Sequence, residues 1–150
     1  MRSLFAAAFA LGLAVVTLGT AGCGALTRAK ECKELVTSIN SGVTALDALG
    51  KAKSGSEPAS VAQSLRKMAD AYERLAADTA KVGVTTAELK TQAATYGGLA
   101  KKSAQAARDF ALAIEAKDTQ KARAAEKEFD KLADEEAKLV EAMNKTCQGG

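Results

Sequence analysis

The fold is decided first by residues 32–46, which read CKELVTSINSGVTAL. The apolar side chains of this stretch recur in alternating steps of four and three residues, at Cys32, Val36, Ile39, Val43 and Leu46. Such spacing places them on one face of an α-helix, as in a helix that packs along a neighbour. The stretch therefore predicts an amphipathic helix with Cys32 on its buried face.

Three later segments repeat this spacing. In the second, the inward positions are Val61, Leu65, Met68, Tyr72, Leu75, Thr79 and Val82. In the third, they are Leu89, Ala93, Tyr96, Ala100, Ser103, Ala107, Phe110 and Ile114. In the fourth, they are Ala122, Ala125, Phe129, Leu132, Val140, Met143 and Cys147. Because alanine, the strongest helix former, is also abundant, we predict an all-α domain over residues 28–150, built as an antiparallel up-down four-helix bundle.

Turn signals separate the segments. Residues 50–56 lack apolar periodicity, and Ser56 is expected to cap the second helix, with Pro58 in its first turn. Gly83 is expected to end that helix as a left-handed residue. Residues 85–88, TTAE, then predict a capping box that opens the third helix.

The third helix has two special points. Gly97 and Gly98 interrupt it, which predicts a kink or a close crossing with a neighbouring backbone. The apolar spacing of the third helix continues almost unbroken through residues 117–119, where Asp118 can cap the start of a fourth helix. We predict a tight turn there.

The N-terminal segment has the parts of an export signal. Arg2 gives a positive start, and residues 4–18 are apolar except for Gly12 and Thr17. This run is short for a membrane span, which needs about 20 apolar residues. Residues 1–22 are therefore expected to be a cleaved signal peptide, and the alternative is an uncleaved membrane anchor.

The end of this segment, Thr20-Ala21-Gly22-Cys23, resembles the bacterial lipoprotein signal, in which a cysteine after two small residues is lipidated and becomes the new N-terminus. The family usually has leucine where this chain has Thr20. The resemblance implies that the mature chain is anchored to a bacterial membrane through a lipid on Cys23. The alternative is ordinary cleavage after Ala21, at a small-x-small site.

The resemblance also implies a location. Gram-negative lipoproteins that stay in the inner membrane typically have aspartate directly after the lipidated cysteine. This chain has Gly24 at that position, and so resembles lipoproteins of the outer membrane. Residues 23–27 are expected to form a short tether of roughly 10 Å, at about 3.3–3.6 Å per residue. The bundle would then stand close to the membrane.

The chain has three cysteines, Cys23, Cys32 and Cys147. Export delivers a protein to an oxidising compartment, and lipidation of Cys23 leaves an even number of thiols. An antiparallel four-helix bundle brings the two chain ends together, so Cys32 and Cys147 are expected to form a disulfide, whereas three helices would separate them. The alternative is a pair of reduced core cysteines.

The composition excludes several kinds of site. The sequence contains no histidine, which excludes Ser-His-Asp and Cys-His catalysis and histidine-ligated haem or di-iron sites. Without Arg2, 20 of the 21 basic residues remain against 18 acidic ones. This nearly even charge balance does not indicate the basic surface that binds nucleic acid. No catalytic residue, metal ligand or cofactor is predicted, and the chain is not expected to be an enzyme.

The acidic run at residues 134–136, together with Asp130, is interpreted as a solvated face rather than a cation site. Glu136 falls near the apolar seam. It is expected at the edge of the helix, with Ala133 and Ala137 facing inward.

Tyr72 and Tyr96 fall on apolar seams. One interpretation makes them the lining of a small pocket near Gly97 and Gly98. The other makes them core aromatics whose hydroxyl groups reach the edge of the bundle.

Three functional hypotheses follow. The first is a non-enzymatic, membrane-anchored bundle that acts through contacts with an unidentified envelope protein. The second is a bundle that binds a lipid or a small apolar ligand between its helices. The third is an enzyme, which would need a deep pocket with a strongly perturbed carboxylate or lysine. The sequence does not fix the oligomeric state.

Overall fold

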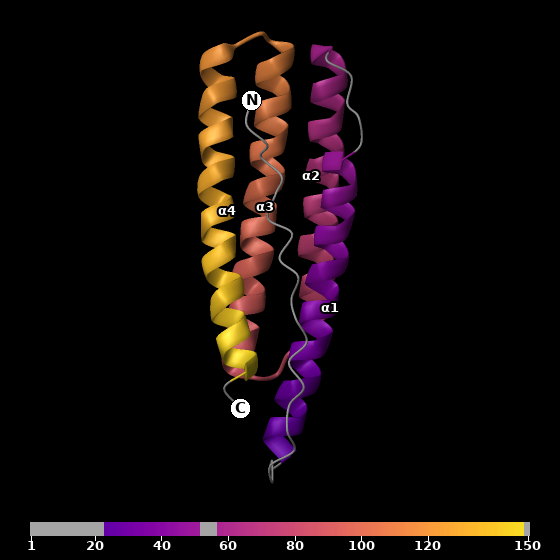
Figure 1. Cartoon of the computed structure of the whole chain (residues 1–150), viewed down its shortest axis with the longest axis vertical. Helices are drawn as coiled ribbons and strands as arrows, with labels where there is room; N and C mark the ends of the chain where they lie inside the picture. Colours follow the sequence, from indigo (N-terminus) through magenta and orange to yellow (C-terminus); the bar gives the residue numbers. More distant parts are fainter. Residues whose placement is uncertain (1–22, 52–56, 149–150) are drawn as a thin grey trace.

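The computed structural model describes residues 23–51 and 57–148, and within these ranges the chain contains α-helices and no strand. Consecutive helices run antiparallel (Figure 1), which confirms the predicted all-α bundle. The predicted signal peptide and the predicted cap at Ser56 lie outside the described residues. The helices are α1 (Cys23–Lys51), α2 (Pro58–Lys81), α3 (Ala87–Glu115) and α4 (Thr119–Gln148).

The tether predicted over residues 23–27 is helical instead, because α1 begins at Cys23. Ala25 and Leu26 are strong helix formers, and Gly24 sits in the first turn, where it interrupts little. These residues therefore advance about 1.5 Å each instead of the 3.3–3.6 Å of an extended chain. No helix in the described part of the chain combines the length and apolarity needed to cross a membrane.

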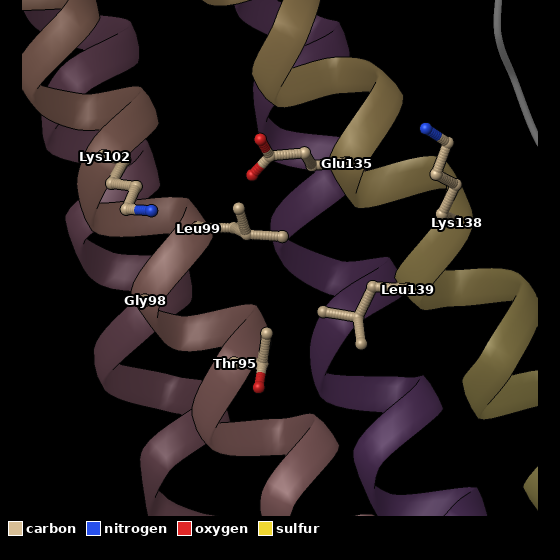
Figure 2. A pocket seen from close by; sticks show the side chains of 7 residues that line it. All are labelled: Thr95, Gly98, Leu99, Lys102, Glu135, Lys138 and Leu139. Atoms are coloured by element: carbon tan, nitrogen blue, oxygen red, sulfur yellow. The ribbon is translucent and has the colours of Figure 1, made fainter.

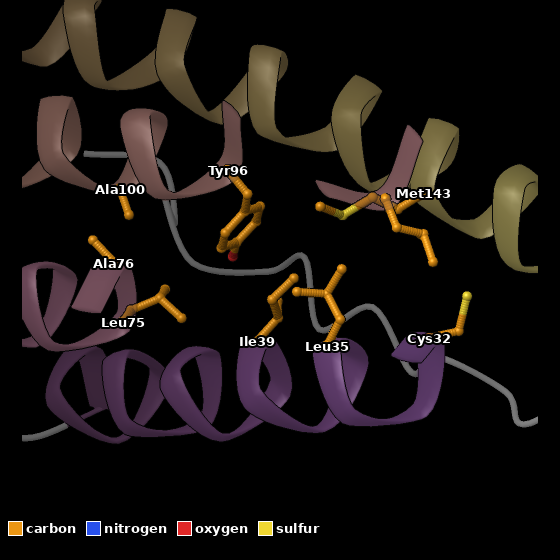
Figure 3. Close-up of a cluster of buried hydrophobic side chains, with 9 residues drawn as sticks. Cys32, Leu35, Ile39, Leu75, Ala76, Tyr96, Ala100 and Met143 are labelled. Atoms are coloured by element: carbon orange, nitrogen blue, oxygen red, sulfur yellow. The ribbon is translucent and has the colours of Figure 1, made fainter. Parts of the chain in front are cut away.

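The bundle has a four-helix core at the end where α1 begins and α4 ends (Figure 3). Leu35 and Ile39 of α1 meet Leu75 of α2, Tyr96 of α3 and Met143 of α4 in one buried cluster. Each of these side chains is at most 5% exposed. This end therefore holds most of the large apolar side chains that stabilise the fold.

The other end has a thinner core from three helices only. Ala69 of α2 packs against Ala104 and Ala107 of α3, with Phe129 of α4 beside them. Most helix packing occurs between α2 and α3 and between α3 and α4, whereas α1 packs mainly on α2. Small alanine side chains allow α2 and α3 to lie close together, and α1 adds little to this end.

The seam of α1 differs from the predicted one. Leu35 is 1% exposed, whereas Val43, predicted to face inward, is 38% exposed. Gly42 takes the inward position instead, because a Cβ atom there would lie 2.4 Å from Cδ1 of Leu75. The close approach of α1 to α2 at Gly42 therefore rotates Val43 toward solvent.

The turn between α3 and α4 is the tight turn that was predicted. The Asp118 carboxylate accepts a hydrogen bond from the Lys121 N–H at 3.0 Å. Lys117 has a φ of 55°, and the N–H groups of Lys117 and Asp118 donate to the carbonyls of Ile114 and Ala113. This pattern of bonds closes the end of α3 as a Schellman motif.

The end of α2 is built differently from the prediction. Its C-cap is Val82, and no described glycine has a positive φ, so Gly83 is not the left-handed residue expected there. Val82 and Val84 pack against the four-helix core. Burial of these valines, rather than a glycine, fixes the path of the turn.

Two arginine clamps join the outer surfaces of α2 and α3. Arg66 binds both carboxylate oxygens of Glu115, at 2.5 and 2.7 Å. Arg108 binds Glu73 at 2.6 Å. A two-point guanidinium–carboxylate pair such as Arg66–Glu115 fixes geometry better than a single lysine contact. Both arginines join α2 to α3 on the exposed surface, where such pairs add little stability.

Candidate functional site

A covalent crosslink joins the beginning of α1 to the end of α4. The sulfur atoms of Cys32 and Cys147 are bonded at 2.06 Å, with their Cα atoms 5.8 Å apart. Cys32 follows Cys23 by nine residues in α1, a rise of about 14 Å at 1.5 Å per residue. The predicted disulfide therefore joins the beginning of α1 to the last turn of α4, close to the predicted lipidation site.

A carboxylate beside the disulfide closes the same end of the bundle. Glu31 is only 5% exposed. Its carboxylate accepts hydrogen bonds from the Thr85 N–H at 2.8 Å, the Thr85 hydroxyl at 2.5 Å and the Thr86 N–H at 3.1 Å. The hydrogen bonds from Thr85, followed by those from Thr86, lower the pKa of the Glu31 carboxyl to about 2. Glu31 thus remains ionised and ties α1 to the turn between α2 and α3.

This arrangement corrects the predicted capping box. The N-cap of α3 is Thr86, and its side chain makes no capping hydrogen bond. Glu31 of α1 satisfies the free N–H groups that a local glutamate was expected to bind. The Glu88 carboxylate instead accepts a hydrogen bond from the Thr146 hydroxyl of α4 at 2.9 Å.

Tyr96 is hydrogen-bonded to a carboxylate inside the bundle, and Tyr72 lies near the same group. The Tyr96 hydroxyl donates to Oε1 of Glu136 at 2.6 Å, and Tyr96 is 2% exposed. Burial and the negative charge of Glu136 raise the pKa of Tyr72 to about 12, and the same causes raise the pKa of Tyr96 well above its usual range. Both phenols are neutral at physiological pH, so this cluster provides a buried donor but no phenolate nucleophile.

Glu136, which was expected at the helix edge, is therefore the residue that turns inward. Ala133 and Ala137, which were expected to face inward, are exposed. The hydrogen bond from Tyr96 offsets the cost of placing a carboxylate against the core. Periodicity alone could not identify this partner across two helices.

An open depression lies near Gly98, but the tyrosines do not line it (Figure 2). It measures about 420 Å³ and lies between α3 and α4. Leu99 and Leu139 form its apolar floor, while Lys102 and Glu135 stand at its rim. Tyr72 and Tyr96 are in the core instead, packed with or against the four-helix cluster.

A second depression, of about 370 Å³, lies at the disulfide end. Arg28 of α1 and Lys145 of α4 border it, together with Glu88 and Thr146. The Gln92 amide donates to the Thr146 hydroxyl at 2.9 Å, so a hydrogen-bonded chain runs from Gln92 through Thr146 to Glu88. This depression carries charges of both signs next to the beginning of α1.

The described ranges contain no group of three or more acidic or cysteine side chains placed to hold a metal ion. Asp130 and Asp134 are exposed on α4. The Nζ atom of Lys131 lies 3.8 Å from the Oε1 atom of Glu128 and 3.8 Å from that of Glu135. Asp130 and Asp134 therefore belong to an exposed helix face that also carries lysine, whereas Glu136 turns inward toward Tyr96.

No family model, curated protein or solved structure matches this chain.

Proposed function

We propose that this chain is a lipid-anchored protein of the bacterial cell envelope. In this proposal, residues 1–22 direct export, Cys23 carries the lipid, and the helical bundle acts through contacts with other envelope proteins without catalysis. The membrane is the outer one if the cell is Gram-negative. The lipoprotein-like sequence at Thr20–Cys23 is the basis for the anchor.

The observation that carries the proposal is the continuous helix from Cys23 to the disulfide. α1 runs without a break from Cys23 through Cys32, which is bonded to Cys147. A lipid on Cys23 would be connected to the bundle by helix alone, without a flexible linker. Such a connection suits a component with a fixed position at the membrane better than a receptor domain on a mobile stalk.

The disulfide supports an exported location, because bonds of this kind persist in oxidising compartments and are rare in the cytosol. The polar networks of the bundle support a structural role for its interior. Glu31 and Glu136 are both engaged in hydrogen bonds between helices. The long helix faces thus remain as the surfaces available to partners.

A second candidate function is the binding of a small apolar ligand. The apolar floor formed by Leu99 and Leu139 between α3 and α4 favours it. Extraction and mass spectrometry of the protein purified from membranes would detect a copurifying lipid. Loss of that lipid in a Leu99→Lys variant, with the fold retained, would favour this function over protein contacts.

The test of the anchor uses metabolic labelling with an alkyne fatty acid. We expect the wild-type chain and the Cys32→Ala, Cys147→Ala double variant to carry the label, and the Cys23→Ala variant to lack it. The double variant is the matched control, because it also loses cysteines but keeps the proposed lipid site. Labelling that persists without Cys23 would contradict the proposal.

The test of the contact role uses photo-crosslinking in living cells. A crosslinking amino acid at exposed positions, one on each helix, should join the chain to a discrete envelope protein from at least one face. The positions are Lys33, Lys67, Lys101 and Lys127, all exposed. Discrete protein adducts from one helix face would support the role, and a complete absence of protein adducts from all four would count against it.

A further inference from the structure

The beginning of α1 projects beyond the rest of the bundle (Figure 1). Glu31 is bonded to the turn between α2 and α3, so the residues that precede it extend past that turn. We call residues 23–30 the projecting segment. Its eight residues rise about 12 Å at 1.5 Å per residue.

The projecting segment carries both an apolar and a basic group. Leu26 is 61% exposed, more than Val43 or Leu112, the other large hydrophobic side chains exposed on the described part of the bundle. Arg28 and Lys30 follow it, and the segment contains no acidic residue. Each described side chain from Ala25 to Lys30 is exposed or half-buried.

We propose that the projecting segment lies against the lipid surface, with Leu26 inserted among the lipids and Arg28 and Lys30 bound to lipid phosphates. This inference rests on the proposed lipid anchor at Cys23. Lys30 lies one turn after Leu26 on the same face of α1. An exposed leucine beside a cation is the combination by which interfacial helices bind anionic membranes. Cationic side chains next to a membrane are attracted by its negative surface potential.

The geometry favours a lipid surface as the occupant over a protein. The start of the segment projects past the ends of α3 and α4 (Figure 1), although Arg28 borders the depression that it shares with Glu88 and Lys145. Its apolar side chain, Leu26, and its basic side chains, Arg28 and Lys30, lie within five residues of one another. Acyl chains and phosphates lie adjacent to each other at every bilayer surface, so one short segment can contact both.

The experiment uses tryptophan as a depth probe, because the natural chain contains none. Leu26→Trp and Leu112→Trp are a matched pair. Leu26 is 61% exposed and Leu112 is 56% exposed, but Leu112 lies near the far end of α3. Each full chain is expressed, processed, purified from membranes and placed in vesicles that contain brominated and anionic phospholipids.

We expect the brominated lipids to quench the fluorescence of the Leu26→Trp variant at least about twofold more than that of Leu112→Trp, since interfacial side chains reach roughly 5–10 Å into the bilayer. Mass spectrometry of the same samples records the lipid on Cys23. Equal quenching of the two variants on a lipid-bearing chain would overturn the inference and leave the anchor standing. A chain without lipid would overturn the proposed function and this inference with it.

A charge variant provides an independent measurement. Arg28→Glu with Lys30→Glu, added to the Leu26→Trp variant, should reduce the quenching of its single tryptophan in anionic vesicles. Lys101→Glu with Lys127→Glu makes the same change of charge on exposed positions of α3 and α4 and should leave the quenching unchanged. Equal effects of the two double changes would contradict the contact of Arg28 and Lys30 with lipid phosphates. A photo-crosslinking amino acid placed at position 26 should give no protein adduct, and a discrete protein adduct from it would overturn the inference in favour of a protein occupant.

Discussion

Glu31 of α1 binds Thr85 at the start of the turn into α3, although the two residues lie 54 positions apart. The carboxylate accepts hydrogen bonds from the N–H and the hydroxyl of Thr85 and from the N–H of Thr86. Cys32, the next residue, is bonded to Cys147. One turn of α1 therefore joins the α2–α3 turn by hydrogen bonds and the end of α4 by a covalent bond.

The Glu31→Gln variant should be less stable than the wild type at pH 7. Glutamine keeps the size of the side chain but cannot accept three hydrogen bonds with a full negative charge. We expect the melting temperature, followed by circular dichroism, to fall by roughly 3–6 °C. Glu34→Gln, an exposed change one turn further along α1, is the control and should have little effect.

The stability difference between wild type and Glu31→Gln should depend on pH. The pKa of Glu31 is lowered from 4.5 to about 2 in the folded protein. The native state therefore favours the ionised carboxylate, and its contribution is fully present above pH 4.5 and lost as the pH falls toward 2. Melting curves of both proteins should converge over this range. A difference that stays constant from pH 6 to about pH 2 would contradict the charged cap.

Gly42→Ala and Gly98→Ala should have opposite effects. A Cβ atom at Gly42 would lie 3.1 Å from Cβ of Leu75, so α1 and α2 would have to move apart. At Gly98 no atom outside the adjacent residues and backbone of its own helix lies within 4 Å of the added methyl group. Alanine in an open helical position gains about 1 kcal/mol over glycine. Denaturant unfolding should show a loss of stability for Gly42→Ala and a gain for Gly98→Ala.

Reduction of the disulfide should lower stability strongly. The bond spans a sequence separation of 115 residues, and the chain-entropy model gives about 4.7 kcal/mol for a loop near that length. We expect the melting temperature to fall by roughly 10–20 °C with reductant. The Cys32→Ser, Cys147→Ser variant should melt at the lower temperature with and without reductant. An unchanged wild-type melt in reductant would show that helix packing alone holds α1.

Tyr96→Phe should reduce the free energy of unfolding, whereas Tyr72→Phe should change it little. The Tyr96 hydroxyl donates to Glu136, and loss of a hydrogen bond to a charged group costs about 1.5–3 kcal/mol. Within the described residues the Tyr72 hydroxyl has no hydrogen-bond partner, so its removal should change the free energy of unfolding little. Equal losses in the two variants would argue against a specific role for the Tyr96–Glu136 bond.

The sequence predicted the helices well because the seams of α2, α3 and α4 each have one apolar face. It was less accurate for α1, where Leu35 and Val36 are both apolar and periodicity does not choose between them. The choice depends on the close approach of Gly42 to Leu75 of α2. That contact is a property of the assembled bundle and has no local signal.

The disulfide was predictable because it depends only on the number and direction of the helices. The cap at Asp118 was also predictable, because its partner is local. The capping box at residues 85–88 was not, because the partners of its groups lie on other helices. Glu31 replaces the local glutamate that a capping box would use, and Glu88 binds Thr146 instead. Similarly, the inward turn of Glu136 depends on the position of the Tyr96 hydroxyl on α3.

The most direct test of the proposed envelope lipoprotein is the intact mass and N-terminal peptide of the mature protein, purified from membranes. We expect a chain that starts at Cys23, carries a covalently bound lipid on that residue, and retains the Cys32–Cys147 disulfide. A mature chain that starts at Gly22 and carries no lipid would contradict this proposal.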